Sequence, residues 1–119
     1  MRWRVDPEQR MSIELADELR KLTMSGKYKG VFSHLANEGK RHQIVAQILK
    51  AMGMIPGASD FMFMWDTGRG CIELKVHPNK QNDNQRHFQA WCEGNNIPYA
   101  VCYSVEQALE VLRQWQAIQ

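Results

Sequence analysis

The residues best suited to chemistry in this sequence are three charged side chains set within apolar segments. Asp60 precedes five bulky apolar residues, 61–65 (FMFMW). Glu73 and Lys75 alternate with apolar residues in the segment 71–76 (CIELKV). Ionised groups are costly to remove from water unless they are paired or bound to a metal ion. The three charges therefore call for a common explanation.

Strand alternation provides that explanation. Successive side chains of a strand point to opposite faces, so Glu73 and Lys75 share one face. A four-residue hairpin loop over 66–69 would pair Trp65 with Gly70, which places Asp60 opposite Lys75 and diagonal to Glu73. Such pairs have Cβ atoms about 5 Å and about 7 Å apart. A loop of odd length would turn Asp60 to the other face and contradict this interpretation.

Two carboxylates and a lysine at this separation suit a divalent metal ion. Hard oxygen ligands hold Mg²⁺, which also accepts phosphate oxygens. A metal ion so held can polarise a phosphoryl group and lower the pKa of a bound water, and a lysine can stabilise developing negative charge. The alternative is a structural ion pair on a solvated sheet face. The acid at the head of the partner strand favours the metal site.

The elements that would position these residues follow from periodicity and turn signals. Asp6, Pro7 and Gln9 predict a capped helix start, and Ser104 with Gln107 predicts another. Helices are expected over about 7–24, 41–52, 85–93 and after 104, and strands over about 28–35, 60–65, 70–76 and 98–103. Phe88, Trp91 and Cys92 are expected on one face of the third helix. The predicted fold is α/β, in the order α-β-α-β-β-α-β-α, with a small mixed β-sheet flanked by helices.

Composition sets further bounds on the molecule. The 119 residues suit a single domain spanning 1–119. The net charge of +2 does not indicate a nucleic-acid-binding protein by itself, so any such role depends on local clusters. Long apolar runs are missing from the sequence, which predicts a soluble protein without a membrane role. The three cysteines lack paired spacing, and we expect small buried side chains in a reducing cytoplasm.

The segments 57–60 (GASD) and 73–75 (ELK) resemble the PD-(D/E)XK nuclease motif, with serine where that name has proline. The wider order of features resembles the VRR-NUC branch, the virus-type replication-repair nuclease domain, and covers most of the chain from about Val31. The matching segments are 37–41 (NEGKR), 49–53 (LKAMG), 56–60 (PGASD), 72–75 (IELK), Gln85 and 99–104 (YAVCYS). The resemblance implies a restriction-endonuclease-like core and Mg²⁺- or Mn²⁺-dependent phosphodiester hydrolysis.

The resemblance also implies roles for individual residues. Asp60 and Glu73 would ligate the metal, with the Leu74 backbone carbonyl as a further ligand, and Lys75 would orient or activate the attacking water. Gln85 matches a polar residue at the start of the following helix. It lies three residues before Phe88, on the same expected face. An ordinary helix-start residue is the alternative for Gln85.

An acid early in the first helix is the remaining ligand that the resemblance implies. Glu8 fits best because apolar residues follow it at helical spacing, and Glu14 is the alternate. An acid in a first turn also favours the helix dipole without any ligand role. The basic residues expected to contact DNA phosphates near the site are Lys40, Arg41, Lys50, Arg69, Lys80 and Arg86.

These expectations describe a stand-alone metal-dependent DNA endonuclease. Base-reading residues are not evident, which favours recognition of DNA shape, such as a four-way (Holliday) junction. Symmetric cuts in a junction would suit a homodimer. The alternatives are a flap or nicking nuclease in phage replication or repair, and a DNA-binding module without catalysis.

Overall fold

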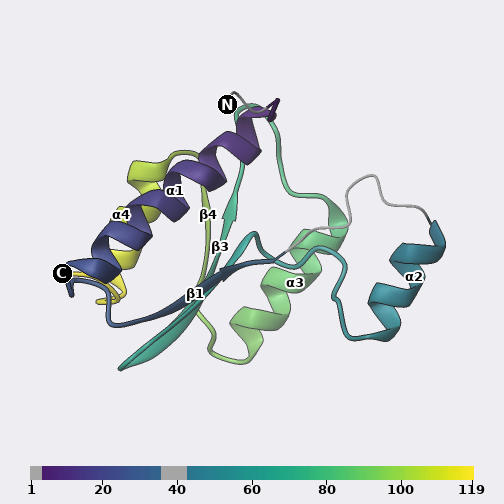
Figure 1. Ribbon diagram of the computed structural model, residues 1–119. Helices are drawn as coiled ribbons and strands as arrows, with labels where there is room; N and C mark the ends of the chain where they lie inside the picture. The colour runs from purple at the N-terminus through teal and green to yellow at the C-terminus, as the bar shows by residue number, and fades with distance from the viewer. Residues whose placement is uncertain (1–3, 36–42) are drawn as a thin grey trace.

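The computed structural model describes residues 4–35 and 43–119 (Figure 1). The element order is the one that the sequence predicts. The helices are α1 (Pro7–Met24), α2 (Gln43–Ala51), α3 (Asp83–Gly94) and α4 (Val105–Gln114). The strands are β1 (Gly30–His34), β2 (Phe61–Trp65), β3 (Gly68–Leu74) and β4 (Tyr99–Cys102). Two of the expected DNA contacts, Lys40 and Arg41, lie outside the described residues.

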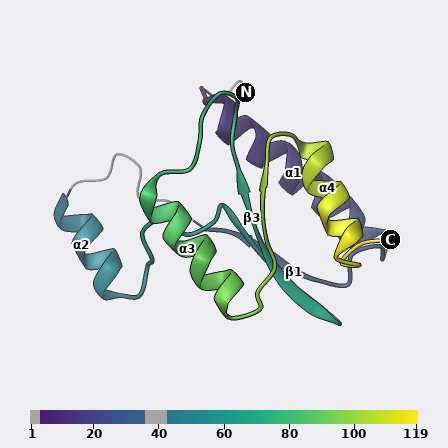
Figure 2. The same cartoon turned by 180° about the vertical axis from the view of Figure 1, so that it is seen from behind.

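The four strands form one mixed sheet in the order β1-β2-β3-β4. The pairs β1–β2 and β2–β3 are antiparallel, and β3–β4 is parallel. Helices α1 and α4 lie on one face of the sheet and α3 lies on the other (Figure 1). Helix α2 lies beyond α3 and away from the sheet (Figure 2). The predicted small mixed α/β fold is thus confirmed.

Alternation along β2 and β3 divides the core between the two faces. Phe61, Phe63, Ile72 and Leu74 are buried in the main core, together with residues of α1 and α4 such as Leu15. This packing is the rigid support of the hairpin, since buried apolar area is the dominant favourable term in folding.

The opposite face of the sheet carries a smaller cluster. There Cys71 packs against Phe88 and Cys92 of α3. All three cysteines are buried and free, as the sequence predicts. The prediction that Trp91 shares the buried face is wrong, because its side chain is 68% exposed. Phe88 and Cys92 are four residues apart and face the sheet. Trp91 lies to one side, where none of the other described helices packs on the sheet.

The β2–β3 hairpin has a shorter loop than the sequence predicts. Trp65 pairs with Gly68, so the loop consists of Asp66 and Thr67 alone, and the predicted pairing of Trp65 with Gly70 is wrong. Two-residue loops match the twist of antiparallel strands. Gly68 belongs to the strand: a Cβ there would lie 2.9 Å from the Trp65 ring, so this glycine serves packing. The loop length remains even, and the faces are those predicted.

The helix caps follow the sequence closely. Asp6 and Gln9 form a reciprocal capping box at the start of α1. Ser104 caps α4 through the Gln107 backbone N–H, while the Gln107 side chain accepts from the Tyr103 N–H.

Within the two described ranges, no helix is long and apolar enough to cross a membrane.

Candidate active site

Two carboxylates meet where β2 begins and β3 ends. Phe61 pairs with Ile72, so the next position of the register places Asp60 opposite Glu73. This corrects the expectation that Asp60 lies opposite Lys75: the two-residue loop moves the register by two positions. The Asp60 Oδ2 accepts a hydrogen bond of 2.6 Å from the Leu74 N–H. The Leu35 N–H donates to the Asp60 carbonyl at 2.7 Å, so backbone groups hold Asp60 on two sides.

Glu73 is the most deeply buried charged side chain of the site, with 1% of its surface exposed. Its Oε2 accepts from the Gln85 Nε2 at 3.2 Å and lies 3.9 Å from the Lys75 Nζ. Its Oε1 is also buried and has no hydrogen-bond partner among the described residues. Buried polar atoms of native proteins are nearly always hydrogen-bonded. One oxygen of this carboxyl group is therefore left to share a proton with the neighbouring Asp60 or to bind a cation.

The electrostatics of the site follow from this burial. Desolvation, and next the negative charge of Asp60, raise the pKa of Glu73 to about 9. The positive charge of Lys75 lowers it, and the charge of Glu8 raises it further. The lysine thus offsets only part of the cost of ionising Glu73. A bound cation would favour the ionised form of both carboxylates.

Helix α3 positions Gln85 with both ends of its amide in use. Asn82 is the N-cap, and its side chain accepts from the Gln85 N–H at 2.9 Å. The Gln85 Oε1 accepts from the Asn82 N–H at 2.9 Å, which leaves Nε2 to donate to Glu73. The interpretation of Gln85 as a helix-start residue is confirmed. Its hydrogen bond to Glu73 brings it to the site, and its functional role stays a prediction.

The segment before Asp60 brings the hairpin against the start of α3. Gly57 has a φ of +80°, and a Cβ there would lie 2.3 Å from the Asn84 carbonyl carbon. Ser59 is fully buried, and its hydroxyl donates to the Phe61 carbonyl at 3.0 Å. The serine therefore supports the backbone at the entry to β2. Glycine is required where the two chain segments touch.

Tyr99 is a site neighbour to which the sequence interpretation gave no role. It pairs with Cys71 in the parallel register, so its side chain shares the face of Glu73. The Gln81 Nε2 donates to its hydroxyl at 3.2 Å. Burial, and then the negative charge of Glu73, raise the pKa of the Tyr99 phenol. Side-chain alternation along the strands places Tyr99 on the face of Glu73, but only when the pairing register of β3 and β4 is known.

Glu8, in the first turn of α1, lies near the site but does not complete a set of metal ligands. Glu8 is half-buried and close enough to influence Glu73, whereas Glu14 is exposed. The structure thus favours Glu8 over Glu14 as the neighbour of the site. In the described part of the chain, however, no group of three carboxylate, imidazole or thiol side chains is close enough to hold a metal ion. The role of Glu8 as a metal ligand therefore stays a prediction.

The predicted basic residues do not all lie beside the site. Lys80 is exposed in the loop between Lys75 and α3, and Lys50 is exposed at the end of α2. Arg86 at the start of α3 is paired with Asp83. Arg69 lies near the hairpin end of β3, four residues and about 13 Å from Glu73 along an extended strand. The expectation that Arg69 lies beside the site is therefore wrong.

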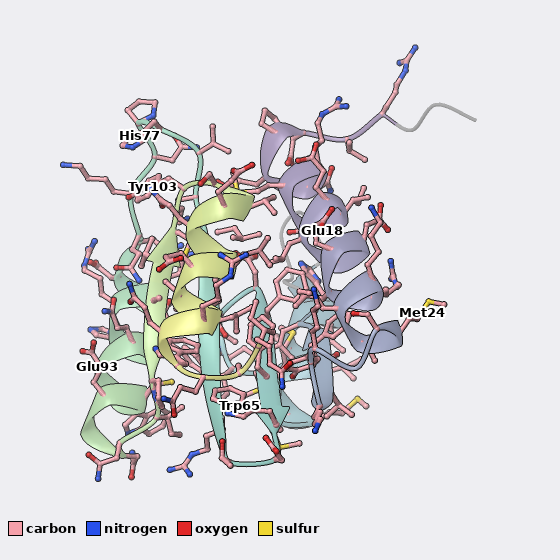
Figure 3. The ribbon with its side chains drawn as sticks, turned by 90° about the vertical axis from the view of Figure 1, so that its left-hand side faces the viewer. Glu18, Met24, Trp65, His77, Glu93 and Tyr103 are labelled. Atoms are coloured by element: carbon pink, nitrogen blue, oxygen red, sulfur yellow. The ribbon has the colours of Figure 1, made fainter. Side chains whose placement is uncertain are left out.

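The two ends of the sheet are well separated. Figure 3 shows Trp65 at the hairpin end and His77, two residues beyond Lys75, at the opposite end. The His77 and Tyr103 rings stack there with centroids 4.3 Å apart. The carboxylates thus lie toward the end of the sheet from which the loop leads to α3. Lys80 and Arg86, near this loop, are better placed than Arg69 to contact a ligand of the site.

The donor set fits a hard divalent cation. Asp60 and Glu73 supply carboxylate oxygens, and one of them is buried without a partner in the part of the chain that the structure describes. A strand residue directs its N–H and C=O to the same side, and the Leu74 N–H reaches Asp60, so the Leu74 carbonyl faces the same side. Oxygen ligands of this kind suit Mg²⁺ or Mn²⁺.

No protein-family model matches the chain, and comparisons with curated proteins and with solved structures give no significant match.

Proposed function

We propose that this protein is a Mg²⁺- or Mn²⁺-dependent DNA endonuclease with a PD-(D/E)XK-type site and a restriction-endonuclease-like core. The observation that carries the proposal is the buried carboxylate of Glu73. It lies opposite Asp60 and 3.9 Å from the Lys75 amine, and one of its oxygens has no hydrogen-bond partner within residues 4–35 and 43–119. A second carboxylate beside the ion pair, and a buried carboxylate oxygen without a partner among the described residues, favour a cation site over a purely structural ion pair.

Each residue of the site has a role in this proposal. Asp60, Glu73 and the Leu74 carbonyl would hold the metal, which when bound polarises the phosphoryl group and lowers the pKa of a bound water. Gln85 holds Glu73 in place through its 3.2 Å hydrogen bond. The Leu74 N–H fixes the Asp60 carboxylate. These contacts preorganise the oxygens before a substrate arrives.

Lys75 is the residue that would act on the attacking water. Its side chain is 10% exposed, so its amine is held close to the carboxylates. A cation there can orient the water and stabilise charge on the phosphoryl oxygens. Removing a group that acts on a proton in the transition state costs about 10²- to 10⁴-fold in rate.

The substrate in this proposal is branched DNA, such as a four-way junction. Lys50, Lys80 and Arg86 can contact phosphates, which contribute affinity and little sequence information. The basic residues of the described chain are dispersed, and none is organised with neighbours for base readout. A protein that binds through phosphates selects its substrate by DNA shape. A flap or nicking substrate is the alternative within the same chemistry.

The test compares Lys75→Ala with Lys21→Ala. The second substitution removes the same positive charge from an exposed, ion-paired residue of α1. Both variants and wild type are incubated with a four-way junction, a flap and a linear duplex, in Mg²⁺, Mn²⁺ or chelator. We expect wild type and Lys21→Ala to cleave the junction only with metal, and Lys75→Ala to be at least about 10²-fold slower. Circular dichroism checks that Lys75→Ala is folded.

The remaining outcomes are equally informative. Equal cleavage by Lys75→Ala and Lys21→Ala would remove Lys75 from the site. Preference for the flap would replace the junction as substrate and keep the chemistry. If wild type binds the junction but cleaves none of the three DNAs with either metal, the nuclease proposal fails in favour of a DNA-binding module.

A further inference from the structure

Two aromatic rings lie together at the end of the sheet where the carboxylates meet. The His77 and Tyr103 rings stack with centroids 4.3 Å apart and planes inclined by 20°. Figure 3 shows both side chains at this end of the molecule, far from Trp65 at the hairpin end. Tyr103 is half-buried, whereas the His77 side chain is exposed although Tyr103 covers one face of its ring. The exposed surface of the imidazole is therefore its other face and its edges. We call this pair the ring stack.

The sheet places the ring stack beside Lys75. Leu74 pairs with Cys102 in the parallel register, and the Lys75 N–H donates to the Cys102 carbonyl at 2.9 Å. The next position of the register therefore brings Tyr103 alongside Lys75, at the spacing of neighbouring strands, about 4.8 Å. His77 follows Lys75 by two residues, which span at most about 7 Å. The ring stack thus adjoins the lysine that would act on the attacking water.

The local chain holds both rings in place. His77 lies inside a tight turn, in which the Asn79 N–H donates to the Val76 carbonyl at 2.8 Å. The Tyr103 N–H donates to the Gln107 side chain at 2.7 Å, at the capped start of α4. The backbone on each side of the ring stack is therefore fixed. A ligand that stacks on the rings immobilises little more of the protein, and such preorganisation favours binding.

Lysines flank the ring stack along the chain. Lys75 precedes His77, and the exposed Lys80 follows it in the loop that leads to α3. The ring stack lies on the β4 side of the sheet, whereas β1, the strand that precedes residues 36–42, is at the opposite edge. Protein surfaces that bind single-stranded nucleic acid combine cations for the phosphates with aromatic rings on which bases stack. The ring stack and its lysines are such a combination.

We propose that the ring stack receives an unpaired base next to the branch point of the DNA substrate. Inside a duplex, both faces of a base are covered by its neighbours, so the base would have to leave the helix to cover a protein ring. An unpaired base has a free face, and aromatic side chains, including histidine, stack on such bases. The span from Lys75 to His77 is comparable to two steps of about 3.4 Å along one DNA strand. The inference rests on the proposed function and narrows its substrate to branched DNA with unpaired nucleotides.

The test measures the affinity for a flap DNA by fluorescence anisotropy, with Ca²⁺ as a cation that takes the same oxygen ligands. His77→Ala removes the exposed ring, and His77→Phe keeps a ring at the same position. The control is His87→Ala, which removes an exposed histidine of α3 outside the ring stack. We expect His77→Ala to bind the flap about 10-fold more weakly than wild type, because one stacking contact is lost. His77→Phe and His87→Ala should bind as wild type does.

A second flap separates stacking from every other effect of the substitution. Its two unpaired nucleotides next to the branch are abasic, so the phosphates remain and the bases are absent. Wild type should bind this flap about 10-fold more weakly than the intact flap, whereas His77→Ala should bind the two flaps equally. The proposal is overturned if wild type binds neither flap or binds both equally, if His77→Ala keeps the preference for the intact flap, or if His77→Phe behaves like His77→Ala.

Cleavage of the intact flap in Mg²⁺ distinguishes failure of this inference from failure of the proposed function. Affinity that depends on the base and on His77, without cleavage, would remove the nuclease activity and keep the ring stack as a binding site. Metal-dependent cleavage without that dependence would remove the ring stack from the site and keep the nuclease. His77 is exposed, and circular dichroism verifies that its variants are folded.

Discussion

At the scale of single residues, the buried carboxyl group of Glu73 is costly to ionise. Its pKa is raised from 4.5 to about 9, first by burial and then by Asp60. Between these values the folded protein binds more protons than the unfolded chain, so the free energy of unfolding falls as pH rises. We predict this decline for metal-free protein. In Glu73→Gln the decline should be largely absent, and the variant should be more stable than wild type near the upper end of the range.

The measurement is urea unfolding in chelator at several pH values between those limits. Glu14→Gln removes an exposed acid of α1 and should keep the wild-type slope. Adding Mg²⁺ should stabilise wild type most at high pH, because the ligands must be deprotonated to bind a metal, and it should stabilise Glu73→Gln less. Parallel pH profiles for wild type and Glu73→Gln would show that Glu73 is not the group whose pKa is raised by folding.

At the scale of elements, the approach of the 53–60 segment to α3 sets the position of Gln85. In Gly57→Ala the new Cβ would lie 2.3 Å from the Asn84 carbonyl carbon at a φ of +80°. We predict a loss of about 1–3 kcal/mol in stability and a fall in metal-dependent cleavage, because displacing the start of α3 moves the Gln85 amide away from Glu73. Urea unfolding and junction cleavage measure the two effects.

Gly26→Ala is the matched control for this substitution. Gly26 has a similar φ of +76°, but a Cβ there meets nothing within 4 Å. Its cost is therefore conformational strain alone, about 1–2 kcal/mol, without an effect on cleavage. If Gly57→Ala cleaves DNA as well as Gly26→Ala does, the contact between this segment and α3 does not position the site.

The elements also show which features local sequence can specify. Helix caps and side-chain alternation depend on near neighbours, so the capped start of α1 and the shared face of Glu73 and Lys75 follow from the sequence. The hairpin register does not, because Gly68 reads as a turn residue while its place is set by the Trp65 ring. The amphipathic pattern of α3 predicts a buried Trp91 because it assumes that neighbouring elements cover both sides of the buried face of the helix. The hairpin register and the exposure of Trp91 both depend on tertiary packing, which local sequence does not specify.

At the scale of the whole molecule, the homodimer that junction cleavage would suit and the proposed nuclease site make a joint prediction. A two-fold dimer carries two copies of Asp60, Glu73 and Lys75 in one assembly. On a supercoiled plasmid that extrudes a cruciform, two cuts within one binding event give linear DNA, whereas one cut gives a nicked circle. We predict linear product at protein concentrations where the wild-type chain is dimeric, and predominantly nicked product where dilution makes it monomeric.

The comparison of product types separates dimer formation from catalysis. Dilution changes association and leaves Asp60, Glu73 and Lys75 of each chain in place, so a monomer should still make one cut. Sedimentation at each protein concentration gives the oligomeric state. Raising the concentration again should restore linear product, because only association has changed. Linear product from a demonstrably monomeric chain would mean that one chain makes both cuts, and the pairing of two sites would then have no part in the reaction.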